Sequence, residues 1–217
     1  MHPAAAQLSG SVTLSSEARL RGRPVSQHRP VAELQLLHDS DSGVYLGGSA
    51  ALATTRGGGL QPLSLSQYAG IVRRISPSAA IDLGIIHSGY TEYSGIAGGG
   101  SYTEAYVGVT GRNLSARIFL SPGYFRRKEP TFYAEVNGNL DLSREWALLV
   151  HAGRLTYLHD RPHYGADTIT DWRVGLRRQI GRFSLDASWI GHTESERPYG
   201  TPERDGNVLV AALGLDF

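Results

Sequence analysis

The chain has 217 residues, contains no cysteine and carries a formal net charge of +1. The lack of cysteine excludes disulfides and thiolate metal sites, and the near-neutral charge gives no electrostatic footprint for nucleic acid. No run approaches the roughly 18 consecutive apolar residues that a membrane helix needs, yet a mean hydropathy of -0.23 fits a barrel with one apolar and one polar face.

Apolar and polar residues alternate in segments of about ten residues that are separated by turn residues, as strands of a transmembrane barrel do. Over residues 130–141, for example, Phe132 and Val136 share one face and Glu135 lies on the other. The pattern predicts about twelve strands, at residues 9–22, 29–38, 43–55, 63–75, 79–88, 101–111, 113–121, 130–141, 145–156, 168–180, 182–193 and 206–217. We therefore expect an all-β fold, a single closed antiparallel transmembrane β-barrel.

The connections between these strands differ by parity. Those after even-numbered strands are tight, at residues 39–42, 76–78, 112, 142–144 and 181, whereas those after odd-numbered strands are mostly longer, such as 89–100, 157–167 and 194–205. Short periplasmic turns and longer external loops are typical of an outer-membrane barrel whose two termini are periplasmic. A soluble lipocalin-like barrel is the alternative fold, disfavoured because such barrels have fewer strands and turn their apolar faces inward.

The two ends of the chain suggest export and assembly. Residues 1–7 resemble the end of an export signal after trimming, so we expect a residual N-terminal segment at 1–7 and one barrel domain at 8–217. The last strand ends on the aromatic Phe217, which resembles the signal that outer-membrane barrels present to the barrel assembly machinery. These features predict an integral protein of the bacterial outer membrane.

Several short motifs, in the same order along most of the chain, are similar to a known family. They are Arg21-Gly22, Ser26-Gln27 and Pro30, then His38-Asp39, residues 41–47 and Ser49, and later residues 104–108, 121–125 and 171–175. With these motifs the chain resembles the Gcw_chp family of Gram-negative outer-membrane proteins, whose function is undefined. The sequence departs from the pattern at residues 39–42 and 23–25, which affects loop details. The resemblance implies location and architecture, and it supplies no catalytic residues.

Charged residues of both signs fall on the face that the register turns inward. The predicted lumen-lining residues are Glu17, Arg19, Glu33, Arg74, Asp82, Glu104, Arg117, Glu135, Asp171, Arg173, Arg177, Asp186 and His192. Two interpretations stay open, because a barrel of this size can hold either water or side chains. One is a narrow hydrated pore whose charges select solutes, and the other is a lumen plugged by ion pairs and hydrogen bonds.

A Tyr-x-Gly pattern recurs on the same face, at residues 45–47, 68–70 and 106–108. Inward glycines let the wall curve, and an aromatic ring from a neighbouring strand can cover the exposed backbone. We expect this structural role rather than a stacking site for sugars or bases.

Two further groups of residues bear on possible chemistry. Arg126, Arg127 and Lys128 fall in a predicted external loop, where they could contact lipopolysaccharide phosphates or simply be solvated. Histidines and carboxylates gather in the later hairpins, but their spacing fits no metal site or hydrolytic constellation. Ser188 and His192 read as inward, away from acyl chains, so we expect no enzyme, no metal and no cofactor.

The sequence thus predicts an outer-membrane barrel that acts as a narrow porin-like channel for small polar or charged solutes. A non-conducting structural or surface-binding barrel is the first alternative, and a lipid-modifying enzyme is the second. The expected partners are outer-membrane lipid, lipopolysaccharide and the barrel assembly machinery, with no nucleic acid.

Overall fold

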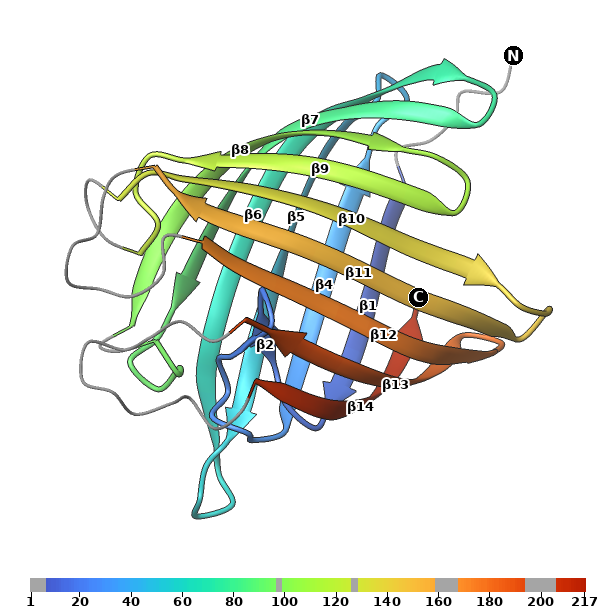
Figure 1. Ribbon diagram of the computed structural model, residues 1–217. Helices are drawn as coiled ribbons and strands as arrows, with labels where there is room; N and C mark the ends of the chain where they lie inside the picture. Colours follow the sequence, from blue (N-terminus) through green and yellow to red (C-terminus); the bar gives the residue numbers. More distant parts are fainter. Residues whose placement is uncertain (1–6, 97–98, 126–128, 159–167, 194–205) are drawn as a thin grey trace.

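Twelve strands in the described part of the chain close into one antiparallel barrel, in the order β1-β14-β13-β12-β11-β10-β9-β8-β7-β6-β5-β4 (Figure 1). The computed structural model describes residues 7–96, 99–125, 129–158, 168–193 and 206–217. The barrel strands are β1 (Gln7–Ser15), β4 (Val31–Asp39), β5 (Val44–Thr54), β6 (Leu60–Ser76), β7 (Ala79–Tyr90), β8 (Gly100–Thr110), β9 (Leu114–Ser121), β10 (Thr131–Asp141), β11 (Trp146–Tyr157), β12 (Thr168–Ile180), β13 (Phe183–His192) and β14 (Asn207–Asp216). Closure leaves no unpaired sheet edge.

A second, two-stranded sheet pairs β2 (Arg19–Leu20) with β3 (Arg23–Pro24). It belongs to residues 16–30, which connect β1 to β4 and which we call the inner segment. Over the described residues, none of the secondary structure is a helix with the length and apolar character to cross a membrane.

All predicted strands agree with the structure within a few residues except the first. The prediction of a strand over 9–22 was wrong at its end, because β1 stops at Ser15. Beyond that point Arg21, Gln27 and His28 have φ values of 50°, 54° and 58°. Left-handed backbone cannot continue an extended strand, so the chain leaves the barrel wall.

The parity of the connections is confirmed. Short turns at 40–43, 77–78, 111–113, 142–145 and 181–182 gather at one end of the barrel, and the longer connections gather at the other (Figure 1). We call these the turn end and the loop end. β1 starts at the turn end, since Gln7 pairs with Asp39, and the chain also finishes there, where Phe217 and Gly10 exchange backbone hydrogen bonds.

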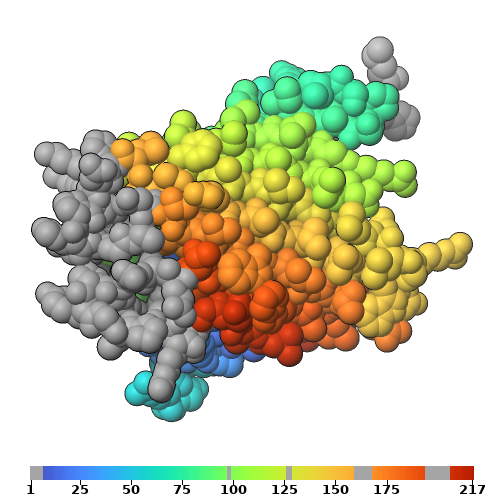
Figure 2. Space-filling view, in the orientation of Figure 1, coloured from blue at the N-terminus to red at the C-terminus, as the bar shows by residue number. Residues whose placement is uncertain are grey.

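The outer face of the barrel is apolar. Leu8, Leu46 and Leu209 are 68%, 57% and 69% exposed, although leucine is usually buried in a water-soluble protein. Trp146 and Trp189 also point outward. On the face shown in Figure 2, side chains of the later strands form a continuous wall. An apolar exterior of this kind is suited to lipid.

Tyrosines cover glycines on the inner face. A Cβ atom added at Gly47 on β5 would lie 2.6 Å from Cζ of Tyr68, the residue opposite it on β6. In the second pair the tyrosine is on β5 and the glycine on β6, and Tyr45 covers Gly70. The structural interpretation of the Tyr-x-Gly pattern is therefore confirmed at these two pairs. Gly108 differs, since it faces the side chain of Arg117.

Candidate functional site

The alternation of each strand brings most of the predicted lumen residues to one inner face. Asp82, which is 6% exposed, lies between the outward-facing Ile81 and Leu83 on β7. On the other strands, too, side chains alternate between the outer and the inner face, and the predicted lumen residues of the wall occupy the inner positions. The residues that line the wall from within are Glu33 on β4, Arg74 on β6, Asp82 on β7, Glu104 on β8, Arg117 on β9, Glu135 on β10, Asp171, Arg173 and Arg177 on β12, and Asp186 and His192 on β13.

Glu17 and Arg19 reach the interior by another route. They belong to the inner segment rather than to a strand of the wall, which corrects their predicted position. The Glu17 carboxylate pairs with Arg19 and lies 2.6 Å from Nδ1 of His28, and the Arg19 guanidinium donates to the carbonyl of Gly22. These contacts tie both arms of the inner segment to each other.

The inner segment is anchored to the wall through Arg21. Its guanidinium donates to both carboxylate oxygens of Glu104, at 2.8 and 2.7 Å, and lies 3.9 Å from the ring centroid of Tyr133 and 4.8 Å from that of Tyr124. The Arg21 and Glu104 side chains are only 8% and 3% exposed. A cation held by a bidentate carboxylate and aromatic faces is strongly fixed in place.

The Arg21 anchor is a charged guanidinium at every physiological pH, because arginine does not lose its proton in proteins.

Next to Arg21, the inner segment touches a second part of the wall. A Cβ atom added at Gly22 would lie 2.6 Å from the carbonyl oxygen of Gly191 and 3.0 Å from Cβ of Asp171, and Gly22 has a φ of +76°. Only glycine tolerates that conformation and that proximity. The inner segment, which connects the neighbouring strands β1 and β4, therefore crosses the lumen and contacts β8, β10, β12 and β13 on its far side.

An aromatic cluster fills the same part of the lumen. Tyr102 and Tyr133 project from the wall, and Tyr124 and Phe125 fold in from the connection between β9 and β10. Tyr102 lies 4.7 Å from both Tyr124 and Phe125 between ring centroids. No periodic pattern in the sequence predicts this cluster, because Tyr124 and Phe125 come from a loop.

Two polar networks occupy neighbouring parts of the inner wall. Arg117 donates to Asp82 at 3.0 Å, and Tyr45 donates to the same carboxylate. His151 lies between Asp171 and Asn137, with ring nitrogens 2.7 Å from an oxygen of each. Within the described residues no group of histidines and carboxylates could hold a metal ion.

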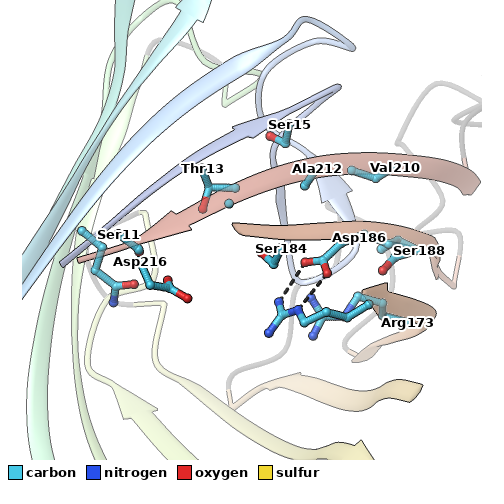
Figure 3. A pocket seen from close by; sticks show the side chains of 14 residues that line it. Ser11, Thr13, Ser15, Arg173, Ser184, Asp186, Ser188, Val210, Ala212 and Asp216 are labelled. Atoms are coloured by element: carbon cyan, nitrogen blue, oxygen red, sulfur yellow. Dashed lines mark hydrogen bonds and ion pairs between the residues drawn. The ribbon is translucent and has the colours of Figure 1, made fainter. Parts of the chain in front are cut away.

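The remaining part of the lumen is hollow. A cavity of about 440 Å³ lies along β1, β12, β13 and β14, where side chains point into a common space (Figure 3). On β14 its lining runs from Val210 to Asp216, which corresponds to roughly 20 Å of strand. Its lining residues are Ser11, Thr13, Ser15, Gln35, Arg173, Arg177, Ser184, Asp186, Ser188, Ile190, Val210, Ala212, Gly214 and Asp216.

The lumen thus combines both arrangements that the sequence left open. Ion pairs, aromatic rings and the inner segment fill one side, and a cavity lined by hydroxyl and charged groups occupies the other. Ser188 and His192 both lie on the inner face, as predicted. The predicted lipopolysaccharide contacts Arg126, Arg127 and Lys128 lie outside the described residues, as do the histidines at 159 and 163.

A closed barrel with an apolar exterior and a polar interior is the architecture of an integral outer-membrane protein, and this chain has that architecture. The chain belongs to Gcw_chp, a family of bacterial proteins of unknown function, whose model matches residues 2–212. No curated protein matches the sequence.

Solved structures with a similar fold are outer-membrane porins and channels. A NanC porin aligns with a TM-score of 0.62 at 10% identity, over 97% of this chain and 99% of its own. A KdgM porin aligns with a TM-score of 0.55 at 11% identity, over 96% and 98%. The COG4313 outer membrane channel from Pseudomonas putida F1 aligns with a TM-score of 0.57 at 14% identity, over 100% and 96%. At these identities the likeness concerns the fold.

Proposed function

We propose that this protein is a narrow outer-membrane channel for small polar or charged solutes. The observation that carries the proposal is the hollow side of the lumen, where a cavity of about 440 Å³ is lined by hydroxyls and by charges of both signs. That volume is within the range of about 300–1,000 Å³ that small-molecule sites occupy. A plugged barrel would have no reason to keep such a hydrophilic space.

The proposed path follows β1, β14, β13 and β12 past the inner segment. Eight-stranded barrels are usually filled by their side chains, and barrels of 16–18 strands leave a wide aqueous channel. A twelve-stranded wall that is half filled gives a bore between these limits. We further propose that the turn end and both termini face the periplasm, as short turns do in this class.

A second candidate is a barrel that does not conduct, and the inner segment is the observation that favours it. Its Arg21 anchor and the close contact at Gly22 hold it across the lumen. A structural or surface-binding barrel needs no open path through the lumen, so a fixed inner segment is compatible with such a role. The two candidates differ in whether solutes pass beside the inner segment.

Swelling of proteoliposomes tests the proposal. Vesicles that contain the refolded protein are diluted into isotonic solutions of a pentose, a hexose or a trisaccharide. We expect swelling with the two small sugars and none with the trisaccharide, and heat-unfolded protein serves as the control. A protein with the gel mobility of a folded barrel that admits none of the sugars would refute the channel and favour the second candidate.

A further inference from the structure

The lumen cavity contains an arginine that forms no ion pair within the described residues. Arg173 and Arg177 both line the cavity from β12, and Figure 3 shows the side chain of Arg173 there. Arg177 is neutralised by Asp186, since its Nε and one terminal nitrogen donate to the two carboxylate oxygens at 2.7 and 2.8 Å. Arg173 forms no ion pair within the described part of the chain, and its buried Nε makes no hydrogen bond there.

The carboxylates of Asp186 and Glu135 act on Arg173 from a distance, and neither forms an ion pair with it. The residues opposite it in the sheet are His151, which is bonded to Asp171 and Asn137, and Ile190, which is apolar. Glu135 of β10 accepts a hydrogen bond from Asn137 at 3.1 Å. Arg173 is half-buried and its buried Nε has no hydrogen-bond partner, so an anion supplied from the cavity would be favourable here.

The space next to Arg173 can admit such an anion. Gly175 separates the two arginines on the inner face of β12, and the hydroxyl of Ser188 lies where a side chain of residue 175 would stand. A planar guanidinium binds a carboxylate through two parallel hydrogen bonds, and a serine hydroxyl can donate a third.

The rest of the cavity is suited to hydroxyl groups. Ser11, Thr13 and Ser15 of β1 line the cavity together with Ser184 and Ser188 of β13. A hydroxyl both donates and accepts, so a row of them matches a ligand that carries several hydroxyls of its own. Asp186 balances Arg177, and the other carboxylate of the lining, Asp216, lies toward the turn end, so Arg173 supplies the positive charge in the part of the cavity next to Ser188.

We propose that Arg173 and Ser188 form a binding site for the carboxylate of a small polyhydroxylated acid, whose hydroxyls contact the serines and threonine of β1 and β13. That the acid passes through the lumen rests on the proposed channel function. The binding of the acid at Arg173 does not depend on conduction.

Titration calorimetry on the folded barrel in detergent tests the site. The ligand is gluconate, and sorbitol is the control because it has the same six-carbon chain with a hydroxyl in place of the carboxylate. We expect gluconate to bind and sorbitol not to bind. Arg173→Gln should weaken gluconate binding at least tenfold, and Arg173→Lys should recover part of the loss. Arg178→Gln, which alters an exposed arginine paired with Glu145, should bind as the wild type does.

Outcomes that overturn the site are distinct from those that overturn the channel. Absence of gluconate binding, equal binding of sorbitol, or full binding by a folded Arg173→Gln variant would each refute the site. Planar-bilayer recordings on the same preparations separate the two proposals. A barrel that does not conduct but binds gluconate through Arg173 would support the binding site and refute the channel. A barrel that conducts but does not bind gluconate would support the channel and refute the binding site.

Discussion

Replacing Glu104 with glutamine removes the carboxylate that anchors the inner segment while keeping the size of the side chain. The variant leaves the Arg21 guanidinium inside the lumen, where it is 8% exposed, without its counter-charge. Breaking a buried ion pair by removal of one partner costs about 3–5 kcal/mol. The glutamine carbonyl can still accept one hydrogen bond and the aromatic rings remain, so we expect a value near the lower limit, about 3 kcal/mol.

A loss of about 3 kcal/mol from the anchored state raises the ratio of released to anchored inner segment by about two orders of magnitude. In planar bilayers, Glu104→Gln should therefore visit larger conductance levels more often than the wild type. Heat-dependent gel mobility shows whether the variant is folded.

A matched control is available at the turn end. Glu145 pairs with Arg178 in an exposed ion pair, where the side chains are 56% and 45% exposed, so Glu145→Gln should cost at most about 1 kcal/mol and leave the conductance unchanged. If a folded Glu104→Gln variant conducts as the wild type does, or if Glu145→Gln has the same effect, the anchoring role of the Arg21–Glu104 pair is wrong.

Three other substitutions test different parts of the lumen. Gly22→Val should displace the inner segment and increase solute flux into proteoliposomes, because valine fits neither the positive φ nor the close contact with the wall; flux equal to that of the wild type would contradict this. Arg173→Gln removes a positive charge from the cavity, and a unit charge about 6 Å from a permeating ion contributes about 0.7 kcal/mol in water, with opposite signs for cations and anions, so cation permeability relative to anions should rise about tenfold in reversal-potential measurements. An unchanged reversal potential would place Arg173 off the path. Gly47→Val overpacks the ring of Tyr68 and should lower the free energy of unfolding in urea by about 1–3 kcal/mol, whereas equal stability would refute the packing argument.

The strands of the barrel wall and their register could be predicted from the sequence. Alternate residues of each strand face lipid, which requires apolar side chains, and the lumen, which accepts polar ones. The pattern around Glu135 is unambiguous for this reason: an outward charge in lipid is excluded, so the register has one solution. The same constraint fixed the inward direction of Arg173, Arg177 and Asp186. Tight turns added the parity of the connections.

The inner segment could not be deduced by the same reasoning. Glu17, Arg19 and Arg21 continue the two-residue alternation after β1, so the pattern extended the first strand through them. A hairpin inside a polar lumen and a strand of its wall both present charges at alternate positions. The signal that distinguishes them is weak: the outward position after Leu14 is the polar Ser16, and Gly22 follows shortly after.

The sequence also does not predict which side chains contact each other across the lumen. Arg21 was not among the predicted site residues, although it has the same parity as Glu17 and Arg19 and belongs to the Arg21-Gly22 motif. Its partners Glu104 and Tyr124 lie more than 80 residues away, and contacts of that kind depend on the barrel circumference. Alternation gives the direction of a side chain and not its partner.

The central claim is that the half-filled lumen conducts, and single-channel recording of the refolded wild-type protein in a planar lipid bilayer tests it most directly. The account predicts steady, reproducible current steps, with an ion selectivity under a salt gradient that changes in Arg173→Gln. A preparation that shows the heat-dependent mobility of a folded barrel, inserts into the bilayer and stays silent would contradict it.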